Sequence, residues 1–354
     1  MAATPTAPQP TEAEWAAAVD AVGRLLAGDG RILLVCHVNP DGDALGSMLG
    51  FGLGLRRLGV RQLQATFPGR PEVPEPFRSM PGLDLLVPAT EAYPDPDLVI
   101  CFDIAAVSRL GDLVDRLDRA GTSLVLDHHA SNTRFGRTNL VDPFAAATSV
   151  VVEQLLDRLG APLDREIAEC LYIALATDTG SFRFDMTTPA VHEMAARLLA
   201  TGLRPGEISQ RIFDTRPYGA VRLYGDVLAR AQLEPLAVGG LGLVWTYATL
   251  EDLARHGQRP YTLEPLIDSV RCTAEADVSF VLKQVAEAEW AVSMRSKGAT
   301  DVSRVAVALG GGGHRLAAGF TAYGSVPDVV DTIRAELARG TGDPGRTGTD
   351  LQDQ

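Results

Sequence analysis

Acidic and imidazole side chains follow three short apolar runs in the first half of the chain. These side chains are His37, Asp41 and Asp43 after residues 32–36, Asp103 after residues 98–102, and Asp127, His128 and His129 after residues 124–126. If the runs are strands of one parallel sheet, their carboxyl ends meet in one crevice, where ligands bind in such folds. A further aspartate, Asp178, ends an alanine-rich helical pattern and would approach that crevice from its rim.

Two of these aspartates are separated by a single glycine. Asp41 and Asp43 flank Gly42, and in an extended loop their carboxylates point to different sides and can serve two neighbouring cations. Gly42 lets the backbone turn tightly between them. The alternative is a simple Asp-Gly turn. His37 favours a metal site, because a turn does not need a histidine four residues earlier.

Two consecutive histidines follow an aspartate at the end of a buried-looking run. Asp127, His128 and His129 are costly to bury unless each has a partner, and a hydrogen-bonded core cluster is the alternative to a metal site. The whole ligand set is rich in oxygen, contains imidazole and lacks thiolate, which favours Mn²⁺ or Mg²⁺ over structural zinc. Two such ions activate water and stabilise a transferring phosphoryl group, so phosphoester hydrolysis is the expected chemistry.

A glycine run with cationic neighbours lies in the last third of the chain. The residues concerned are Gly310, Gly311, Gly312 and Gly313, followed by His314 and Arg315, with Arg295 on a preceding strand-like segment. Backbone N–H groups of such glycines can face an anion, as in anion-binding nests. A flexible surface loop is the alternative, and the segment is no Walker motif because GK[ST] is absent. The cationic neighbours favour phosphate capture.

Short apolar runs alternate with helical patterns in the first half, which is typical of a parallel α/β sheet. We expect strands at 32–36, 98–102 and 124–126, and helices at 11–26, from about 44, at 148–159 and at 164–176. In the second half we expect strands at 241–247, 278–285 and 290–294, and helices at 261–270 and 326–338. Thr148 and Ser149 are interpreted as capping residues, and the glycines at 50, 52 and 54 as sites of close helix packing.

The expected fold class is α/β, with helices flanking a parallel sheet in a larger N-terminal domain and a smaller mixed α/β domain across a cleft. A chain of 354 residues is long enough for two such cores. The predicted boundaries are a disordered tail at 1–12, a catalytic domain at 13–205, a linker region at 206–220, a substrate-binding domain at 221–340 and a disordered tail at 341–354.

The formal net charge of −13 repels long polyanions, and no Lys/Arg block forms a basic track, so extended DNA or RNA is not an expected partner.

The N-terminus lacks a secretion signal and no apolar stretch is long enough to span a bilayer. We therefore expect a cytoplasmic protein without membrane contact. The cysteines form no CxxC pair and are interpreted as buried free thiols: Cys36, Cys101, Cys170 and Cys272.

Six segments resemble the motifs of a known family. In chain order they are HVNPDGDALGS (37–47), VICFDI (99–104), LVLDHH (124–129), TDTGSF (177–182), SMRS (293–296) and GGGGHRLAAGF (310–320). The first four resemble DHH phosphoesterases, and the last two resemble the DHHA1 domain that accompanies them. The match covers about residues 14–340. Among the branches, the chain looks most like the NrnA-type bifunctional oligoribonucleases and 3′-phosphoadenosine-5′-phosphate phosphatases.

The resemblance implies two metal ions that share one aspartate. One ion would be held by His37, Asp41 and Asp103, and the other by Asp43, Asp103, His128 and Asp178. Asp127 would orient a ligand histidine, and His129 would lie toward the scissile phosphate.

The resemblance also implies that the DHHA1 domain holds the terminal phosphate and base of a nucleotide. The residues implied are Arg295, Gly311, Gly312, Gly313, His314 and Arg315. Cys36 departs from the family pattern, because many relatives carry an acidic or hydroxyl residue before the histidine.

The activity implied is hydrolysis, with two Mn²⁺ ions or Mg²⁺ in their place, of very short oligoribonucleotides to mononucleotides and of 3′-phosphoadenosine-5′-phosphate to AMP. Linear dinucleotides such as pApA and cyclic di-AMP are further expected substrates, and a homodimer is expected from the family. The alternatives are an inorganic pyrophosphatase or polyphosphatase, a RecJ-like single-strand exonuclease, and a catalytically dead nucleotide sensor. The glycine-rich segment disfavours a pyrophosphatase or polyphosphatase. The missing basic track disfavours a RecJ-like exonuclease, and the complete ligand set disfavours a catalytically dead sensor.

Overall fold

The computed structural model describes residues 8–26, 28–69 and 72–340. Of the predicted disordered tails, residues 1–7 and 341–354 lie outside the described residues, whereas Glu12 already belongs to a helix. The chain divides into two compact units, Met1–Thr215 and Arg216–Gln354. The predicted linker region, 206–220, contains most of helix α7 (Pro205–Ile212) and the start of α8 (Tyr218–Ala229).

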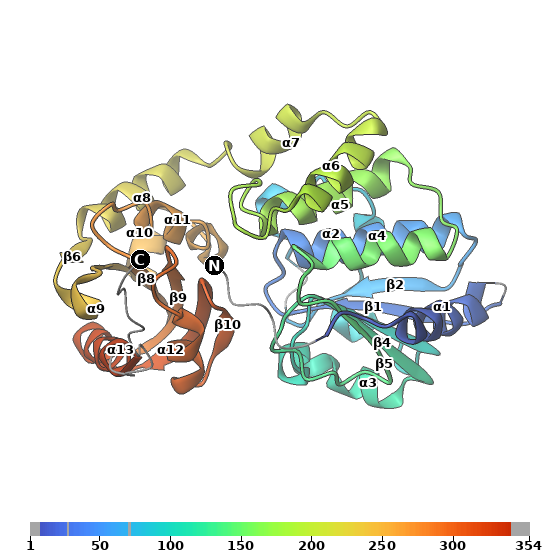
Figure 1. The fold of residues 1–354 in the computed structure, drawn as a ribbon, viewed down its shortest axis with the longest axis horizontal. Coiled ribbons are helices and arrows are strands. Elements are labelled where there is room, and N and C mark those ends of the chain that lie inside the picture. Colours follow the sequence, from blue (N-terminus) through green and yellow to red (C-terminus); the bar gives the residue numbers. More distant parts are fainter. Residues whose placement is uncertain (1–7, 27, 70–71, 341–354) are drawn as a thin grey trace, which may run out of the picture. The chain divides into compact units, whose positions relative to one another are not determined.

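The first unit is built on a five-stranded sheet in the order β2-β1-β3-β4-β5 (Figure 1). All neighbouring strands are parallel. The strands are β1 (Ile32–Cys36), β2 (Leu63–Thr66), β3 (Leu98–Phe102), β4 (Thr122–Asp127) and β5 (Thr138–Val141). The three predicted strands are confirmed as β1, β3 and β4, whereas the short strands β2 and β5 are not among the predicted elements.

Helices cover both faces of this sheet. One face packs in a large hydrophobic core against α1 (Glu12–Leu26), α2 (Gly42–Arg57), α4 (Thr148–Arg158), α5 (Arg165–Asp178) and α6 (Pro189–Ala200). The other face packs in a smaller core against η3 (Ala89–Glu91), η4 (Val107–Leu113) and α3 (Val114–Arg119). Figure 1 shows α2 and α4 on one side of the sheet and α3 on the other. Two 3-10 turns, η1 (Glu75–Phe77) and η2 (Leu83–Leu85), follow β2.

The predicted helix starts in this unit have the expected chemistry. Thr11 N donates to Glu14 Oε2 at 2.7 Å and Glu14 N donates to Thr11 Oγ1 at 3.3 Å, which forms a capping box before α1. The carboxylate of Asp164 accepts hydrogen bonds from the first turn of α5. The helices predicted at 148–159 and 164–176 are confirmed to within two residues at each end as α4 and α5.

Glycines in α2 let this helix approach α5 closely. A Cβ atom at Gly46 would lie 2.8 Å from Ala174 Cβ and would overlap the carbonyl oxygen of Cys170. A Cβ atom at Gly50 would lie 3.0 Å from Leu171 Cδ2. The predicted close helix packing is therefore confirmed at Gly50, and at Gly54 against Leu156 of α4, whereas Gly52 faces Leu34 of β1 and Leu85 of η2. Helices α2 and α5 share one of the most extensive contacts between elements of the unit.

The second unit is built on a mixed six-stranded sheet in the order β10-β11-β9-β8-β7-β6. Strands β7 and β8 are parallel and the other neighbours are antiparallel. The strands are β6 (Gln232–Glu234), β7 (Leu243–Ala248), β8 (Val278–Ala286), β9 (Glu289–Ser296), β10 (Gly312–His314) and β11 (Ala317–Tyr323). The short turn α9 (Ala237–Gly240) joins β6 to β7.

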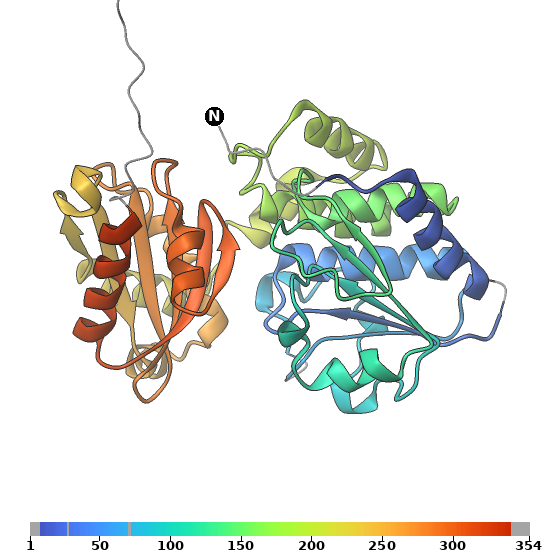
Figure 2. The same cartoon turned by 60° about the horizontal axis from the view of Figure 1, so that its bottom comes forward.

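Helices also cover both faces of the second sheet. One hydrophobic core lies under α12 (Val302–Ala308) and α13 (Val326–Gly340), and another lies under α8, α10 (Leu250–Arg255) and α11 (Leu266–Val270). Figure 2 shows α13, in red, packed along the sheet. The fold class is thus α/β with a parallel and a mixed sheet, as predicted. None of the helices in the described ranges combines the length and hydropathy needed to cross a membrane.

Two details differ from the prediction. The helix predicted at 261–270 is wrong as a single element, because Pro265 separates the 3-10 turn η5 (Pro260–Leu263) from α11 and cannot donate the N–H of a continuous helix. Cys272 is exposed, so its interpretation as a buried thiol is wrong, while the other three cysteines are buried.

We expect Gly46→Ala to lower the free energy of unfolding by about 1–3 kcal/mol, because the new methyl group overpacks the contact between α2 and α5. Gly23→Ala in α1 is the matched control. No atom lies within 4 Å of its Cβ position, and alanine should stabilise that helix by about 0.5–1 kcal/mol. Urea denaturation of both variants measures the difference, and equal effects would contradict the packing argument.

Candidate metal centre

The strand order of the first sheet brings the ends of three strands together. In the order β2-β1-β3-β4-β5 the connections leave β1 and β3 toward opposite faces, and a crevice opens at the carboxyl ends of these two strands. His37 directly follows β1, Asp103 directly follows β3, and Asp127 is the last residue of β4. The sheet therefore delivers side chains from three separate chain segments to one place.

The first group of donor atoms comes from the ends of β1 and β3. His37 Nε2 lies 3.8 Å from Asp41 Oδ2 and 3.4 Å from Asp103 Oδ2. His37 Nδ1 donates to the carbonyl oxygen of Val38 at 2.8 Å, which leaves the lone pair on Nε2. Asp41 Oδ1 accepts from Ala44 N at 3.0 Å as the N-cap of α2, so Oδ2 is turned toward the group.

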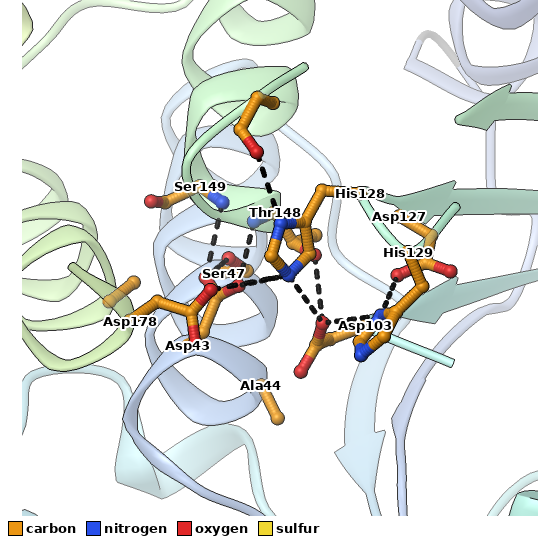
Figure 3. A network of polar contacts seen from close by, with 12 residues as sticks. Asp43, Ala44, Ser47, Asp103, Asp127, His128, His129, Thr148, Ser149 and Asp178 are labelled. Atoms are coloured by element: carbon orange, nitrogen blue, oxygen red, sulfur yellow. Dashed lines mark hydrogen bonds and ion pairs between the residues drawn. The ribbon is translucent and has the colours of Figure 1, made fainter. Parts of the chain in front are cut away.

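The second group surrounds His128 (Figure 3). His128 Nε2 lies 3.2 Å from Asp178 Oδ2 and 3.9 Å from Asp43 Oδ2. The same nitrogen lies 3.7 Å from Asp103 Oδ1. His128 Nδ1 donates to the carbonyl oxygen of Ala145 at 3.1 Å, which again leaves the lone pair on Nε2. Carboxylates from α2, from the residue after β3 and from α5 thus converge around one imidazole.

Asp103 belongs to both groups. Its Oδ2 faces His37, and its Oδ1 faces His128 and accepts a hydrogen bond from Thr148 Oγ1 at 3.0 Å. Its φ of 58° lies in the left-handed region, which aspartate tolerates better than most residues. Its N–H donates to the carbonyl oxygen of Leu126 on β4 at 3.0 Å. One buried carboxylate therefore joins the two donor groups.

The N-terminus of α4 holds the buried carboxylate of Asp43. Thr148 N donates to Asp43 Oδ2 at 2.6 Å, and Ser149 N donates to Oδ1 at 3.2 Å. Ser47 Oγ donates to the same Oδ1 at 2.9 Å. The unpaired N–H groups and the positive dipole end of a helix stabilise an anion there. The interpretation of Thr148 and Ser149 as caps is wrong, because the cap position is Ala147 and Asp43 of another helix takes the role of a capping side chain.

The segment between the paired aspartates is helical rather than extended. Asp41 is the N-cap of α2, and Asp43 lies in the first turn. The two carboxylates nevertheless belong to different donor groups. A Cβ atom at Gly42 would lie 2.6 Å from Thr177 Cγ2, near the end of α5. The glycine is therefore needed for the approach of α5, which carries Asp178, and not for a tight turn.

Asp127 holds His129 and not a ligand histidine of the second group. His129 Nδ1 lies 2.8 Å from Asp127 Oδ1, and the side chain of Asp127 is fully buried (Figure 3). The prediction that Asp127 orients a metal ligand is wrong for His128, which the carbonyl oxygen of Ala145 orients. Although burial opposes the charged imidazole, the charge and hydrogen bond of Asp127 raise the pKa of His129 to about 10.

Burial, reinforced by repulsion between carboxylates, shifts the pKa values of two aspartates in the cluster. Burial raises the pKa of Asp43 well above its ordinary value, and the charges of Asp103 and Asp178 raise it further. Burial of the carboxylate also raises the pKa of Asp178 to about 6, although 29% of its side chain is exposed. Carboxylate oxygens and imidazole nitrogens that share such a site are ligands that divalent cations accept. The donor set therefore fits metal ions of this kind.

The register of the second sheet brings two predicted substrate residues to one face. His314 on β10 pairs with Ala317 on β11, and Ala317 pairs with Arg295 on β9. Directly paired residues of neighbouring strands point to the same face of a sheet. His314 and Arg295 therefore lie on one face, with the small side chain of Ala317 between them.

The backbone of the glycine run is partly used by the fold itself. Gly310 N and Gly311 N donate to carbonyl oxygens of α12 at 3.1 and 2.7 Å, so the prediction that these two N–H groups face an anion is wrong. Gly312 and Gly313 belong to β10 and pair with β11, so the run is half strand rather than loop. Arg315 Nη2 donates to a backbone carbonyl at 2.7 Å.

Three groups of the cluster escaped the sequence analysis. The contact of Ser47 with Asp43 could have been predicted, because Ser47 lies four residues after Asp43 on the same helix face. Thr148 carried a signal that was interpreted as capping. The carbonyl oxygen of Ala145 carries none, because a backbone contact leaves no trace in the residue type.

Known proteins resemble this chain over most of its length. Residues 31–175 match the model of the DHH family, N-terminal domain, and residues 246–339 match that of the DHHA1 domain. The bifunctional oligoribonuclease and PAP phosphatase NrnA of Thermus thermophilus is 34% identical over 320 residues, which cover 89% of this chain and 93% of that protein. The protein of the same name from Bacillus subtilis is 27% identical over 316 residues, which cover 86% and 93%.

A solved structure shows the same fold. The crystal structure of an exopolyphosphatase-related protein from Bacteroides fragilis has a TM-score of 0.81 and 24% identity, with 92% of this chain and 97% of that chain covered. The family models account for both sheets, and the relative from Thermus thermophilus extends over nearly the whole described chain. The chain therefore belongs to the DHH family of metal-dependent phosphoesterases.

Proposed function

We propose that this chain uses two Mn²⁺ ions to hydrolyse short oligoribonucleotides to mononucleotides and 3′-phosphoadenosine-5′-phosphate to AMP. The observation that carries the proposal is the position of Asp103, whose two oxygens face different donor groups. The residues that would hold the ions are His37, Asp41 and Asp103 for one, and Asp43, Asp103, His128 and Asp178 for the other. When bound, such a pair supplies an activated water and neutralises charge on the phosphoryl group.

The mixed donor set supports Mn²⁺ as the working ion. Each group contains one imidazole among carboxylates, and no thiolate takes part. Carboxylate oxygen suits Mg²⁺, Ca²⁺ and Mn²⁺, and imidazole suits later transition metals. Mn²⁺ accepts both kinds of ligand, and Mg²⁺ would serve less well because it prefers oxygen alone.

His129 supplies the proton that the leaving group needs. Asp127 engages Nδ1 at 2.8 Å, and its charge and hydrogen bond favour the charged ring, which carries a proton on Nε2. A leaving alkoxide takes up that proton as the phosphoester bond breaks, which is general acid catalysis. The hydrogen bond to Asp127 keeps the ring in one orientation.

The proposed substrates are small because the chain has a net charge of −13 and would repel a long polyanion. The face of the second sheet with Arg295 and His314 offers a guanidinium and an imidazole for a phosphate of the substrate. The relatives from Thermus thermophilus and Bacillus subtilis are named as oligoribonucleases and PAP phosphatases, which supports the same substrate class here. We include linear dinucleotides such as pApA and cyclic di-AMP in this class.

Purified protein incubated with Mn²⁺ should release AMP from 5′-phosphorylated oligoadenylates of two to five residues and from 3′-phosphoadenosine-5′-phosphate. EDTA should abolish the release, and added Mn²⁺ should restore it, because the activated water depends on the ions. Chromatography of the products measures both. Hydrolysis of pyrophosphate with no cleavage of the nucleotides would contradict the proposal.

In metal-free protein, Asp178 should make folding less favourable as the pH rises. Its pKa is about 6 in the folded chain against an ordinary value of 3.8, so between these values the folded state binds more protons than the unfolded state. Its contribution to the free energy of unfolding therefore falls from pH 3.8 to about 6. Asp178→Asn should flatten this part of the profile and raise the melting temperature above pH 6. Parallel profiles of melting temperature for wild type and variant would refute the assignment.

Thr148→Val should lower kcat by about 10- to 100-fold, because Asp103 loses the hydroxyl that fixes its Oδ1. The fold should persist, since the variant keeps the size of the side chain and the N–H bound to Asp43. Thr148→Ser, which keeps the hydroxyl, is the matched control and should retain most activity. If valine and serine variants had equal rates on a dinucleotide, the hydrogen bond would have no role in catalysis.

A further inference from the structure

Asn132 makes three side-chain hydrogen bonds in the loop after β4. Its Nδ2 donates to Asp127 Oδ2 at 2.5 Å and to the carbonyl oxygen of Ile104 at 2.9 Å, and its Oδ1 accepts from Arg134 N at 2.6 Å. A carboxylate and a carbonyl only accept, and a backbone N–H only donates, so these partners fix the orientation of the amide. Both hydrogens and the oxygen of the amide are used.

The amide of Asn132 connects the ends of two strands. Ile104 is the residue after Asp103 at the end of β3, and Asp127 is the last residue of β4. Asn132 N also donates to the carbonyl oxygen of His129 at 3.0 Å, which closes the turn that contains this histidine. One side chain is thus tied to the residue beside Asp103, to Asp127 and, through its backbone, to His129.

Asp127 depends on this contact for its orientation. Its carboxylate is fully buried, with Oδ1 on His129 Nδ1 at 2.8 Å and Oδ2 on Asn132 Nδ2. Loss of the amide would leave a buried carboxylate oxygen short of a hydrogen bond, which is costly in a low-dielectric interior. The carboxylate would then turn to find another donor, and the imidazole that rests on Oδ1 would turn with it.

We propose that Asn132 is a positioning residue that acts through Asp127 to aim Nε2 of His129 at the leaving oxygen of the substrate. The inference rests on the proposed phosphoester hydrolysis. In that step the oxygen of water forms a bond to phosphorus and the bond from phosphorus to the 3′ oxygen breaks with its electron pair on that oxygen. The 3′ oxygen takes the proton from His129 Nε2, the attacking water loses a proton to solvent, and His129 regains a proton from solvent after product release.

The test compares two dinucleotides that differ in the need for that proton. One is a 5′-phosphorylated diadenylate, and the other has sulfur in place of the 3′ bridging oxygen, because a thiolate leaves without protonation. Asn132→Asp keeps the size of the side chain and replaces the donating amide by an acceptor beside Asp127. Asn139→Ala is the matched control, since Asn139 also makes two loop hydrogen bonds, to N and O of Gly136, outside the site.

We expect kcat of Asn132→Asp to fall by about 100-fold on the oxygen dinucleotide and by less than about threefold on the sulfur dinucleotide, because only the first needs general acid catalysis. KM and the Mn²⁺ content should change little, and the melting temperature should fall because buried Asp127 loses a hydrogen bond. Asn139→Ala should cleave both substrates at nearly wild-type rates.

An equal loss of kcat on both dinucleotides, or a loss of bound Mn²⁺, would overturn the inference, because Asn132 would then support the metal centre or the fold as a whole. Unchanged cleavage of the oxygen dinucleotide would overturn it as well. A wild-type protein that cleaves neither dinucleotide in Mn²⁺ would overturn the proposed function and this inference with it.

Discussion

Repulsion between carboxylates that must lie close together is the constraint on which the rest of the first unit depends. Asp43 and Asp103 are buried, and Asp178 joins them from another helix. Burial and, after it, the charges of neighbouring carboxylates raise the pKa values of Asp43 and Asp178, so their ionised forms oppose folding when no cation is bound. The surrounding protein has to offset this cost, and it does so with groups placed around each carboxylate.

Two kinds of contact offset the repulsion. The first is electrostatic, because the N-terminus of α4 and the hydroxyl of Ser47 surround Asp43 with donors. The second is steric, because glycines in α2 let α5 approach until the ends that carry Asp43 and Asp178 lie at a fixed separation. The N-terminus of α4 also contacts Asp103, through the hydroxyl of Thr148. The positions of these carboxylates are thus determined by packed helices and strands rather than by mobile loops.

Much of the site could be predicted because it follows the rule that parallel strands bring ligands to their carboxyl ends. To predict His37 and Asp103 as site residues, it was enough to find an apolar run and the polar residue that follows it. The choice of partners could not be predicted. Consecutive histidines point in different directions, and the loops after β4 and β5 decide that Asp127 contacts His129 while Ala145 contacts His128. The glycine run was ambiguous, because glycines after an apolar run can end a helix as readily as they form an anion site.

The backbone of Asp103 restricts what evolution or a protein engineer can put at the centre of the cluster. A left-handed φ of 58° suits aspartate and asparagine and penalises branched or longer side chains. Glutamate would keep the charge, but its backbone would be strained at this φ and its longer side chain would misplace the carboxylate. Asparagine would keep the local geometry and remove the charge. Asparagine is therefore the natural replacement for a substrate trap, a folded and inert form in which crystallography could capture an intact phosphoester beside the crevice.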